Sequence, residues 1–181
     1  MSQTVVGLDP SLTGTAVCVA GSEPKRFTSK PAHGLFARIV RFVGLTEIVA
    51  QEIPKDALVM IEGYSFGSQG DAGRWLAEYG GILRARLIPM SREVVEVAPL
   101  QLKKFATGKG KGDKDVVRAY VERYWGVIHE TSDETDAFVL AQIGLCYSGQ
   151  KEPDNEAQRE VIETLKNGPK KKTRKKAKEP R

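Results

Sequence analysis

Residues 4–20 read TVVGLDPSLTGTAVCVA and contain two apolar runs with only a short connection between them. Residues 3–9 and 14–20 are each predicted to form a buried strand. The connection is too short for a crossover, so the two strands should pair antiparallel as a hairpin. The first run ends at Asp9, which places a carboxylate at the edge of the predicted sheet.

The remainder of the chain alternates helical periodicity with short apolar runs typical of strands. The predicted elements are an edge strand at 25–29, a helix at 35–53, a strand at 57–62, a helix at 71–88, a strand at 94–97, and helices at 99–105, 113–125, 131–147 and 154–166. A hairpin followed by strand–helix units indicates an α/β layer architecture. Within that class a ribonuclease-H-like fold fits best, with a mixed sheet flanked by helices.

Charge divides the chain into a nearly neutral body and a basic end. Residues 168–181 carry eight lysines and arginines against one glutamate, whereas the rest carries 20 basic and 22 acidic residues. We therefore expect a folded domain at 1–150, a surface helix at 151–167 and a disordered basic tail at 168–181. A basic end is often simply solvated, but weak, non-specific contact with nucleic acid is favoured here because other features of the chain suit the same partner.

The cysteines and the apolar runs favour a cytoplasmic protein. Cys18 and Cys146 sit in apolar stretches without metal-ligand spacing, so buried free thiols are expected. Free thiols fit a reducing cytoplasm. No apolar run is long enough to span a bilayer, and the polar residues 2–4 lead directly into the first strand, which argues against a signal peptide.

Four acidic residues occupy positions suited to catalysis. Asp9 and Glu62 each end an apolar strand, and Asp133 and Asp136 lie three apart at the start of a helix, so they share one face. Carboxylates meeting at one sheet edge would repel one another unless a divalent cation lay among them. Oxygen ligands suit Mg²⁺ or Mn²⁺, and the natural chemistry of such a site is two-metal displacement at phosphorus.

Three of the acids, Asp9, Asp133 and Asp136, also have an ordinary explanation when taken alone, whereas Glu62 closes an apolar run and has a stronger case. Asp9 before Pro10 could be a turn former, and acids in a first helical turn are common capping residues. Thr131 and Glu134 are themselves spaced as a capping box. The catalytic interpretation depends on the four acids occurring together in this order of elements.

Lysines and glycines alternate between Thr107 and Lys114 in a pattern that suits phosphate groups. The glycines leave backbone N–H groups accessible and the lysines supply point charges, although a solvated loop is the alternative. The candidate DNA contacts in and near this loop are Lys103, Lys104, Lys109, Lys111 and Lys114.

The glycine-rich loop after Glu62 carries two aromatic residues, Tyr64 and Phe66. They could fold back over the core as a lid or stack on an unpaired base. The sequence leaves these two interpretations about even.

Four segments, taken in order, resemble RuvC-type Holliday-junction resolvases, and the size and tail resemble the bacteriophage branch of that family. The matching segments are Val6-Gly7-Leu8-Asp9-Pro10 with Thr13-Gly14, Val59-Met60-Ile61-Glu62, Val97-Ala98-Pro99 with Lys103-Lys104, Thr107-Gly108-Lys109-Gly110 and Lys114, and Asp133-Glu134-Thr135-Asp136-Ala137. The match spans about residues 4–147. Ser11 stands where the family usually has glycine, and the turn that follows is shorter.

The resemblance implies a Mg²⁺-dependent endodeoxyribonuclease that resolves four-way junctions and leaves 5′-phosphate ends. Other branched DNA, such as three-way and flap structures, is a further expected substrate. Asp9, Glu62, Asp133 and Asp136 would hold two Mg²⁺ ions, which Mn²⁺ could replace, and Lys114 would contact the scissile phosphate. Tyr64 or Phe66 would fill the family's junction-probing position.

The resemblance also implies a homodimer, since two matched cuts require two active sites. The predicted helix at 71–88 is the candidate interface, because Gly80-Gly81 indicates close packing against a neighbour. For a viral protein, the compartment would be the host cytoplasm.

Two other classes of function remain open from the sequence. Asp-x-x-x-Thr-Gly after a first strand also occurs in nucleotide-binding domains of the actin/hexokinase type, although this chain is short for the two domains that such proteins need. A non-catalytic module that binds branched DNA is the other alternative, and the four acids argue against it.

Overall fold

The computed structural model describes residues 3–64, 71–110 and 113–168, apart from the side chain of Lys114. The elements of this described part, in chain order, are β1 (Val5–Asp9), β2 (Thr15–Val19), β3 (Lys25–Phe27), α1 (Leu35–Gln51), β4 (Leu58–Glu62), α2 (Asp71–Leu87), β5 (Glu93–Val97), α3 (Pro99–Thr107), α4 (Lys114–Trp125), α5 (Ser132–Tyr147) and α6 (Glu156–Asn167). Each predicted element is present, with boundaries that differ from the expected ones by a few residues.

The strands form one mixed sheet in the order β3-β2-β1-β4-β5. Strand β1 pairs antiparallel with β2, as the short connection between them predicted, and β3 continues the antiparallel half. On its other side β1 pairs parallel with β4, and β4 pairs parallel with β5. The predicted hairpin-first mixed sheet is therefore confirmed.

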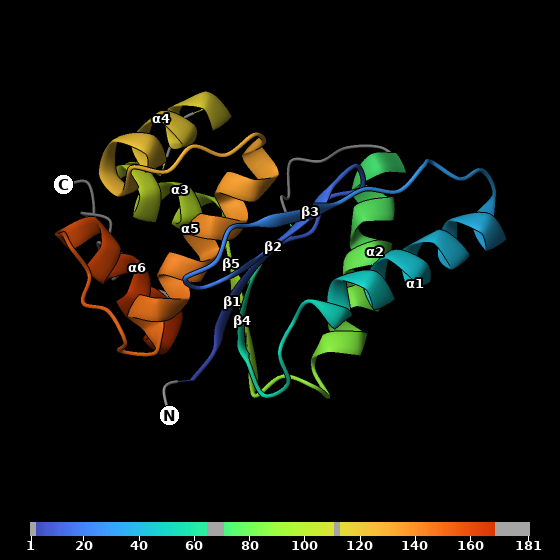
Figure 1. Ribbon diagram of the computed structural model, residues 1–181, viewed down its shortest axis with the longest axis horizontal. Helices are drawn as coiled ribbons and strands as arrows, with labels where there is room; N and C mark the ends of the chain where they lie inside the picture. The colour runs from blue at the N-terminus through green and yellow to red at the C-terminus, as the bar shows by residue number, and fades with distance from the viewer. Residues whose placement is uncertain (1–2, 65–70, 111–112, 169–181) are drawn as a thin grey trace, which may run out of the picture.

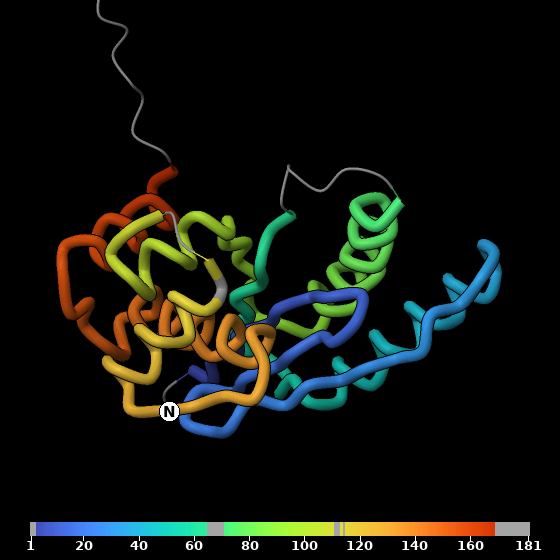
Figure 2. The backbone as a smooth tube through the Cα atoms, turned by 90° about the horizontal axis from the view of Figure 1, so that it is seen from above, coloured from blue at the N-terminus to red at the C-terminus, as the bar shows by residue number. Residues whose placement is uncertain are grey.

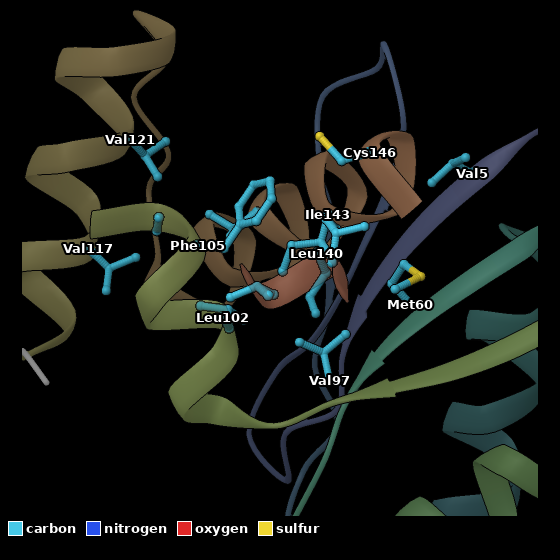
Figure 3. Close-up of a cluster of buried hydrophobic side chains, with 14 of the residues drawn as sticks. Val5, Met60, Val97, Leu102, Phe105, Val117, Val121, Leu140, Ile143 and Cys146 are labelled. Atoms are coloured by element: carbon cyan, nitrogen blue, oxygen red, sulfur yellow. The ribbon is translucent and has the colours of Figure 1, made fainter. Parts of the chain in front are cut away.

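Helices cover both faces of the sheet (Figure 1). Helices α1 and α2 lie on one face, whereas α5 crosses the other face with α3, α4 and α6 grouped beyond it. Side chains alternate between the faces along each strand, so Val5 and Met60 join the core under α5 and Val6 and Leu8 join the core under α1 and α2. Figure 3 shows the core on the α5 side.

Helix α5 lies unusually close to strand β1. A Cβ added at Gly7 would lie 2.0 Å from the carbonyl oxygen of Ala137 and 2.4 Å from the amide nitrogen of Ala141. Further along α5, a Cβ at Gly144 would lie 2.4 Å from a methyl group of Val5. Small residues on both elements are therefore what lets helix and strand approach to backbone contact.

The inward face of α1 is formed by Phe42, Leu45 and Val49, which are buried against the sheet. Several other apolar residues of the same helix are exposed to solvent: Leu35, Phe36, Val40, Val43 and Ile48. Both Figure 1 and Figure 2 show the first turns of α1 reaching beyond the sheet.

The C-terminal helix α6 adds to the core on the α5 side, where Val161 and Ile162 are buried. Cys18 and Cys146 are buried free thiols, as expected. Among the described residues, no helix has both the length and the apolar character needed to cross a membrane. The tail beyond residue 168 lies outside the described residues, so its predicted disorder stays a prediction.

We expect Gly7→Ala to destabilise the protein by about 3 kcal/mol, the upper end of the usual cost of overpacking, because its methyl group would meet backbone atoms of α5. Gly81→Ala is the matched control, since a Cβ there meets nothing within 4 Å. That substitution lies in helix α2 and should stabilise by about 0.5–1 kcal/mol. Urea unfolding measures both, and a wild-type midpoint for Gly7→Ala would contradict the close approach of α5.

Candidate active site

Two of the four acids lie at the ends of neighbouring parallel strands. Asp9 ends β1 and Glu62 ends β4, and the register that pairs Leu8 with Ile61 brings both ends to the same edge. Asp9 follows Gly7 by two residues, so it projects from the face that α5 covers. Glu62 projects from that face by the same alternation.

The other two acids come from the first turn of α5. Thr131 caps this helix, its hydroxyl accepting from the Glu134 amide at 3.3 Å, while the Glu134 carboxylate accepts from the Thr131 amide at 2.8 Å. The predicted capping box is thus confirmed. It fixes where the helix begins, and the helix then presents Asp133 and Asp136 to the strand ends.

All four acids line one pocket of about 430 Å³. The pocket opens between the ends of β1 and β4 and the N-terminal ends of α2, α3 and α5. Leu102 and Val117 contribute apolar surface to it. The structure therefore gathers the acids that the sequence places up to 127 positions apart.

Burial and mutual repulsion dominate the electrostatics of this pocket. Asp9 is only 4% exposed, and burial is the largest cause that raises its pKa well above the ordinary value of 3.8. The negative charges of Glu62, Asp136 and Asp133 raise the pKa of Asp9 further, as does a hydrogen bond between Asp9 and Glu62. A divalent cation in this space would relieve the same repulsion.

The donor set fits a hard divalent cation. Four carboxylates supply only oxygen ligands, which Mg²⁺ and Mn²⁺ prefer, and their fields converge on Asp9. Within the described residues, however, no three His, Cys, Asp or Glu side chains already stand as a ligand set. The four acids line one pocket, and their side chains must move closer together before they can coordinate an ion.

The predicted lysine contacts separate into different environments. Lys103 lines the pocket with the acids, whereas Lys104 forms an ion pair with Glu160 of α6. Lys109 is exposed, and the Thr107 hydroxyl bonds to its backbone, donating to its carbonyl at 2.8 Å. Lys111 and the side chain of Lys114 lie outside the described part of the structure.

Tyr64 folds back onto α2. Its hydroxyl donates to the Ala77 carbonyl at 3.2 Å, and the Arg84 guanidinium lies 4.5 Å from the centre of its ring. A Cβ at Gly80 would lie 2.6 Å from the Tyr64 hydroxyl, so this glycine accommodates Tyr64 within the chain. The geometry favours the lid interpretation for Tyr64, while Phe66 lies outside the described residues.

Sequence reasoning missed the arginines that support this site. Arg26 donates to Asp133 at 3.1 Å, and Arg84 donates to the backbone carbonyl of Glu62 at 3.2 Å. Arg41 donates to the carbonyl of Leu12 in the loop after Asp9. No local pattern could have identified them, because a lone arginine in an edge strand or a helix usually faces solvent.

The chain is similar to curated proteins named crossover junction endodeoxyribonuclease RuvC. It is 34% identical over 148 residues to the protein of Helicobacter hepaticus, covering 76% of this chain and 80% of the relative. It is 29% identical over 146 residues to the protein of Sulfurovum sp., covering 76% and 91%. No family model matches the sequence.

Among solved structures, the chain is similar to T. thermophilus RuvC in complex with a Holliday junction substrate. The TM-score is 0.58 at 18% sequence identity, and the match covers 77% of this chain and 90% of the other. This likeness confirms the predicted ribonuclease-H-like fold. The bacteriophage branch stays a prediction.

We expect Asp9→Asn to raise the melting temperature of the metal-free protein at neutral pH. The raised pKa means that this carboxyl contributes most to stability below pH 3.8, where it is protonated in both the folded and unfolded states. That contribution is lost as the pH rises through the folded-state pKa. An amide avoids the loss, so the gain should be present at neutral pH and absent at about pH 3.

Thermal melting in a chelator across this pH range makes the measurement. Asp154→Asn, at an exposed acid remote from the pocket, is the control and should leave the melting temperature unchanged. A lower melting temperature for Asp9→Asn at neutral pH would show that the Asp9 carboxylate is not under repulsion.

Proposed function

Because the chain belongs to the RuvC family, whose relatives are named crossover junction endodeoxyribonucleases, we propose that it resolves Holliday junctions and other branched DNA. The observation that carries this proposal is the gathering of Asp9, Glu62, Asp133 and Asp136 in one pocket. Three-way and flap structures are further candidate substrates. The reaction is hydrolysis of phosphodiester bonds.

In this proposal the four acids hold two Mg²⁺ ions, for which Mn²⁺ can substitute. When bound, the metal supplies an activated water and stabilises the leaving 3′ oxygen, so that the products carry 5′-phosphates. The acids orient the site, and the pocket position of Lys103 lets its ammonium offset charge on a bound phosphate. Lys114 is proposed as the contact of the scissile phosphate.

The DNA surface extends from the pocket along the loop that follows α3. Lys109 is exposed there, and Lys111 is proposed to act with it on the phosphate backbone. The ion pair of Lys104 with Glu160 supports a bracing role between α3 and α6 in addition to any DNA contact. Phe66 is the better candidate to probe the junction, since Tyr64 packs on α2.

Two further parts of the proposal concern the whole protein. The basic residues of 168–181 add non-specific attraction to DNA. The buried thiols of Cys18 and Cys146 support a cytoplasmic location, where DNA and a reducing medium are both present. Membership of the RuvC family sets aside the actin/hexokinase-type alternative, and a cleavage assay decides between a nuclease and a non-catalytic binding module.

We also propose a homodimer, because two coordinated cuts require two sites related by a twofold axis. The outer face of α1 supports this, since Phe36 is 84% and Val40 is 55% exposed. Solvent-exposed apolar side chains in a row on one helix are typical of an interface. Helix α2 lies beside α1, held by the Arg38–Glu78 ion pair at 2.7 Å, so both helices flank the proposed contact.

This location differs from the interface expected at Gly80-Gly81. Gly80 faces Tyr64 inside the chain, whereas a Cβ at Gly81 would meet open space. The first of these two glycines, Gly80, therefore serves packing within the chain. A second copy of the chain fits the outer face of α1, because a twofold axis places the same apolar row of each copy against the other.

Replacing Asp9, Glu62 or Asp136 by its amide should abolish cleavage while junction binding is retained, because the acids hold metal and the lysines hold DNA. The test incubates labelled four-way, three-way, flap and linear DNA with the protein and Mg²⁺, and measures binding separately by gel shift in Ca²⁺. Asp154→Asn is the control and should cut normally. Near wild-type cutting by Asp9→Asn would refute the metal-site assignment.

Val40→Glu should convert the protein from a dimer to a monomer, because it places a charge in the proposed α1 interface. Light scattering after size-exclusion chromatography measures the mass. Val116→Glu is the matched control, since Val116 is 41% exposed on α4, away from α1, and this variant should stay dimeric. A dimeric mass for Val40→Glu would place the interface elsewhere.

A further inference from the structure

Arg26 approaches the acidic pocket from behind. It lies on β3, the edge strand of the sheet, and it is not among the residues that line the pocket. Its Nε donates to Oδ2 of Asp133 at 3.1 Å. The side chains are 28% and 12% exposed respectively, so this ion pair is largely shielded from solvent.

Neighbouring groups hold the Arg26 guanidinium in place. Its Nη2 donates to the backbone carbonyl of Thr13 at 3.4 Å. A Cβ at Gly14 would lie 2.2 Å from both Nε and Nη2 of Arg26, so the guanidinium rests directly on this glycine. The backbone is fixed as well, because Arg26 pairs with Ala16 of β2.

Arg26 therefore links the chain segments that position two of the proposed catalytic acids, Asp9 and Asp133. Thr13 and Gly14 belong to the connection that follows Asp9, and Asp133 belongs to the first turn of α5. Arg26 bridges these two segments through one carbonyl and one carboxylate. A planar guanidinium can make both bonds at once, which the single ammonium of lysine cannot reproduce with the same geometry.

Groups that hydrogen-bond a metal-binding carboxylate from behind orient it and tune its affinity. We propose that Arg26 is a positioning residue that fixes the Asp133 carboxylate for divalent-ion binding. This inference rests on the proposed metal site. It assigns a role in the reaction to a residue of the edge strand that does not line the pocket.

The direction in which metal affinity changes when Arg26 is removed distinguishes a positioning role from a simple charge effect. A positive charge near the site repels a bound cation, so charge alone predicts that removal of Arg26 tightens metal binding. Positioning predicts the opposite, because Asp133 would lose the Arg26 hydrogen bond that helps to fix its orientation. The affinity for a divalent ion is therefore an informative measurement that does not depend on catalysis.

The test measures Mn²⁺ and Ca²⁺ binding by calorimetry for the full-length protein, Arg26→Gln and Arg26→Lys. Both variants should bind about tenfold more weakly, with the lysine variant showing that charge alone is insufficient. Thermal melting without metal confirms that each variant is folded. In cleavage assays, the Mg²⁺ concentration for half-maximal rate should rise by a similar factor, while the rate at saturating Mg²⁺ largely recovers.

Lys25→Gln is the matched control. It removes the same charge from the adjacent position of β3, where Lys25 pairs with Glu52 at 2.7 Å, and it should leave metal affinity unchanged. Unchanged or tighter binding by Arg26→Gln would overturn the inference while leaving the metal site intact. Absence of divalent-ion binding by the wild-type protein would overturn both the site and the inference.

Discussion

The backbone contact between α5 and β1 is the constraint on which the rest of the structure depends. Gly7 leaves no side chain between the strand and the helix, and Ala137 and Ala141 present only methyl groups around it. Two residues beyond Gly7, the same face of β1 carries Asp9. One turn before Ala137, the same helix carries Asp133. Close packing therefore determines the distance between the acids.

That proximity has an electrostatic cost, which the surrounding groups reduce. Burial and the neighbouring acids raise the pKa of Asp9, while the capped N-terminus of α5 favours negative charge nearby. Arg26 pairs with Asp133 from the rear of the pocket. Arg41 and Arg84 donate to carbonyls at Leu12 and Glu62. Three arginines thus hold the segments that carry or follow the acids, without filling the pocket.

The two faces of the sheet carry different features. The face under α5 holds the acids, and α3, α4 and α6 enlarge its core beside the lysine-rich loop. The face under α1 and α2 has a second core, built around Phe42, Tyr79 and Leu83. Outside that core, α1 presents an apolar surface to solvent. In the proposed homodimer this α1 surface is the contact between copies, and α2 lies beside both that contact and the pocket.

The sequence by itself determined the order and type of the elements, because apolar periodicity and turn residues act over a few neighbouring positions. It also located Asp9, Glu62, Asp133 and Asp136, since each acid interrupts or begins a recognisable local pattern. The capping box at Thr131 was predictable for the same reason.

Only the tertiary structure decided which groups meet across long separations. Tyr64 packs over Gly80, Lys104 pairs with Glu160, and Arg26 reaches Asp133 over 107 positions of sequence. The outward orientation of Phe36 and Val40 was equally hidden, since α1 is apolar on more than one side. Local patterns specify a helix or a strand, but partners and exposed faces depend on how the layers pack together.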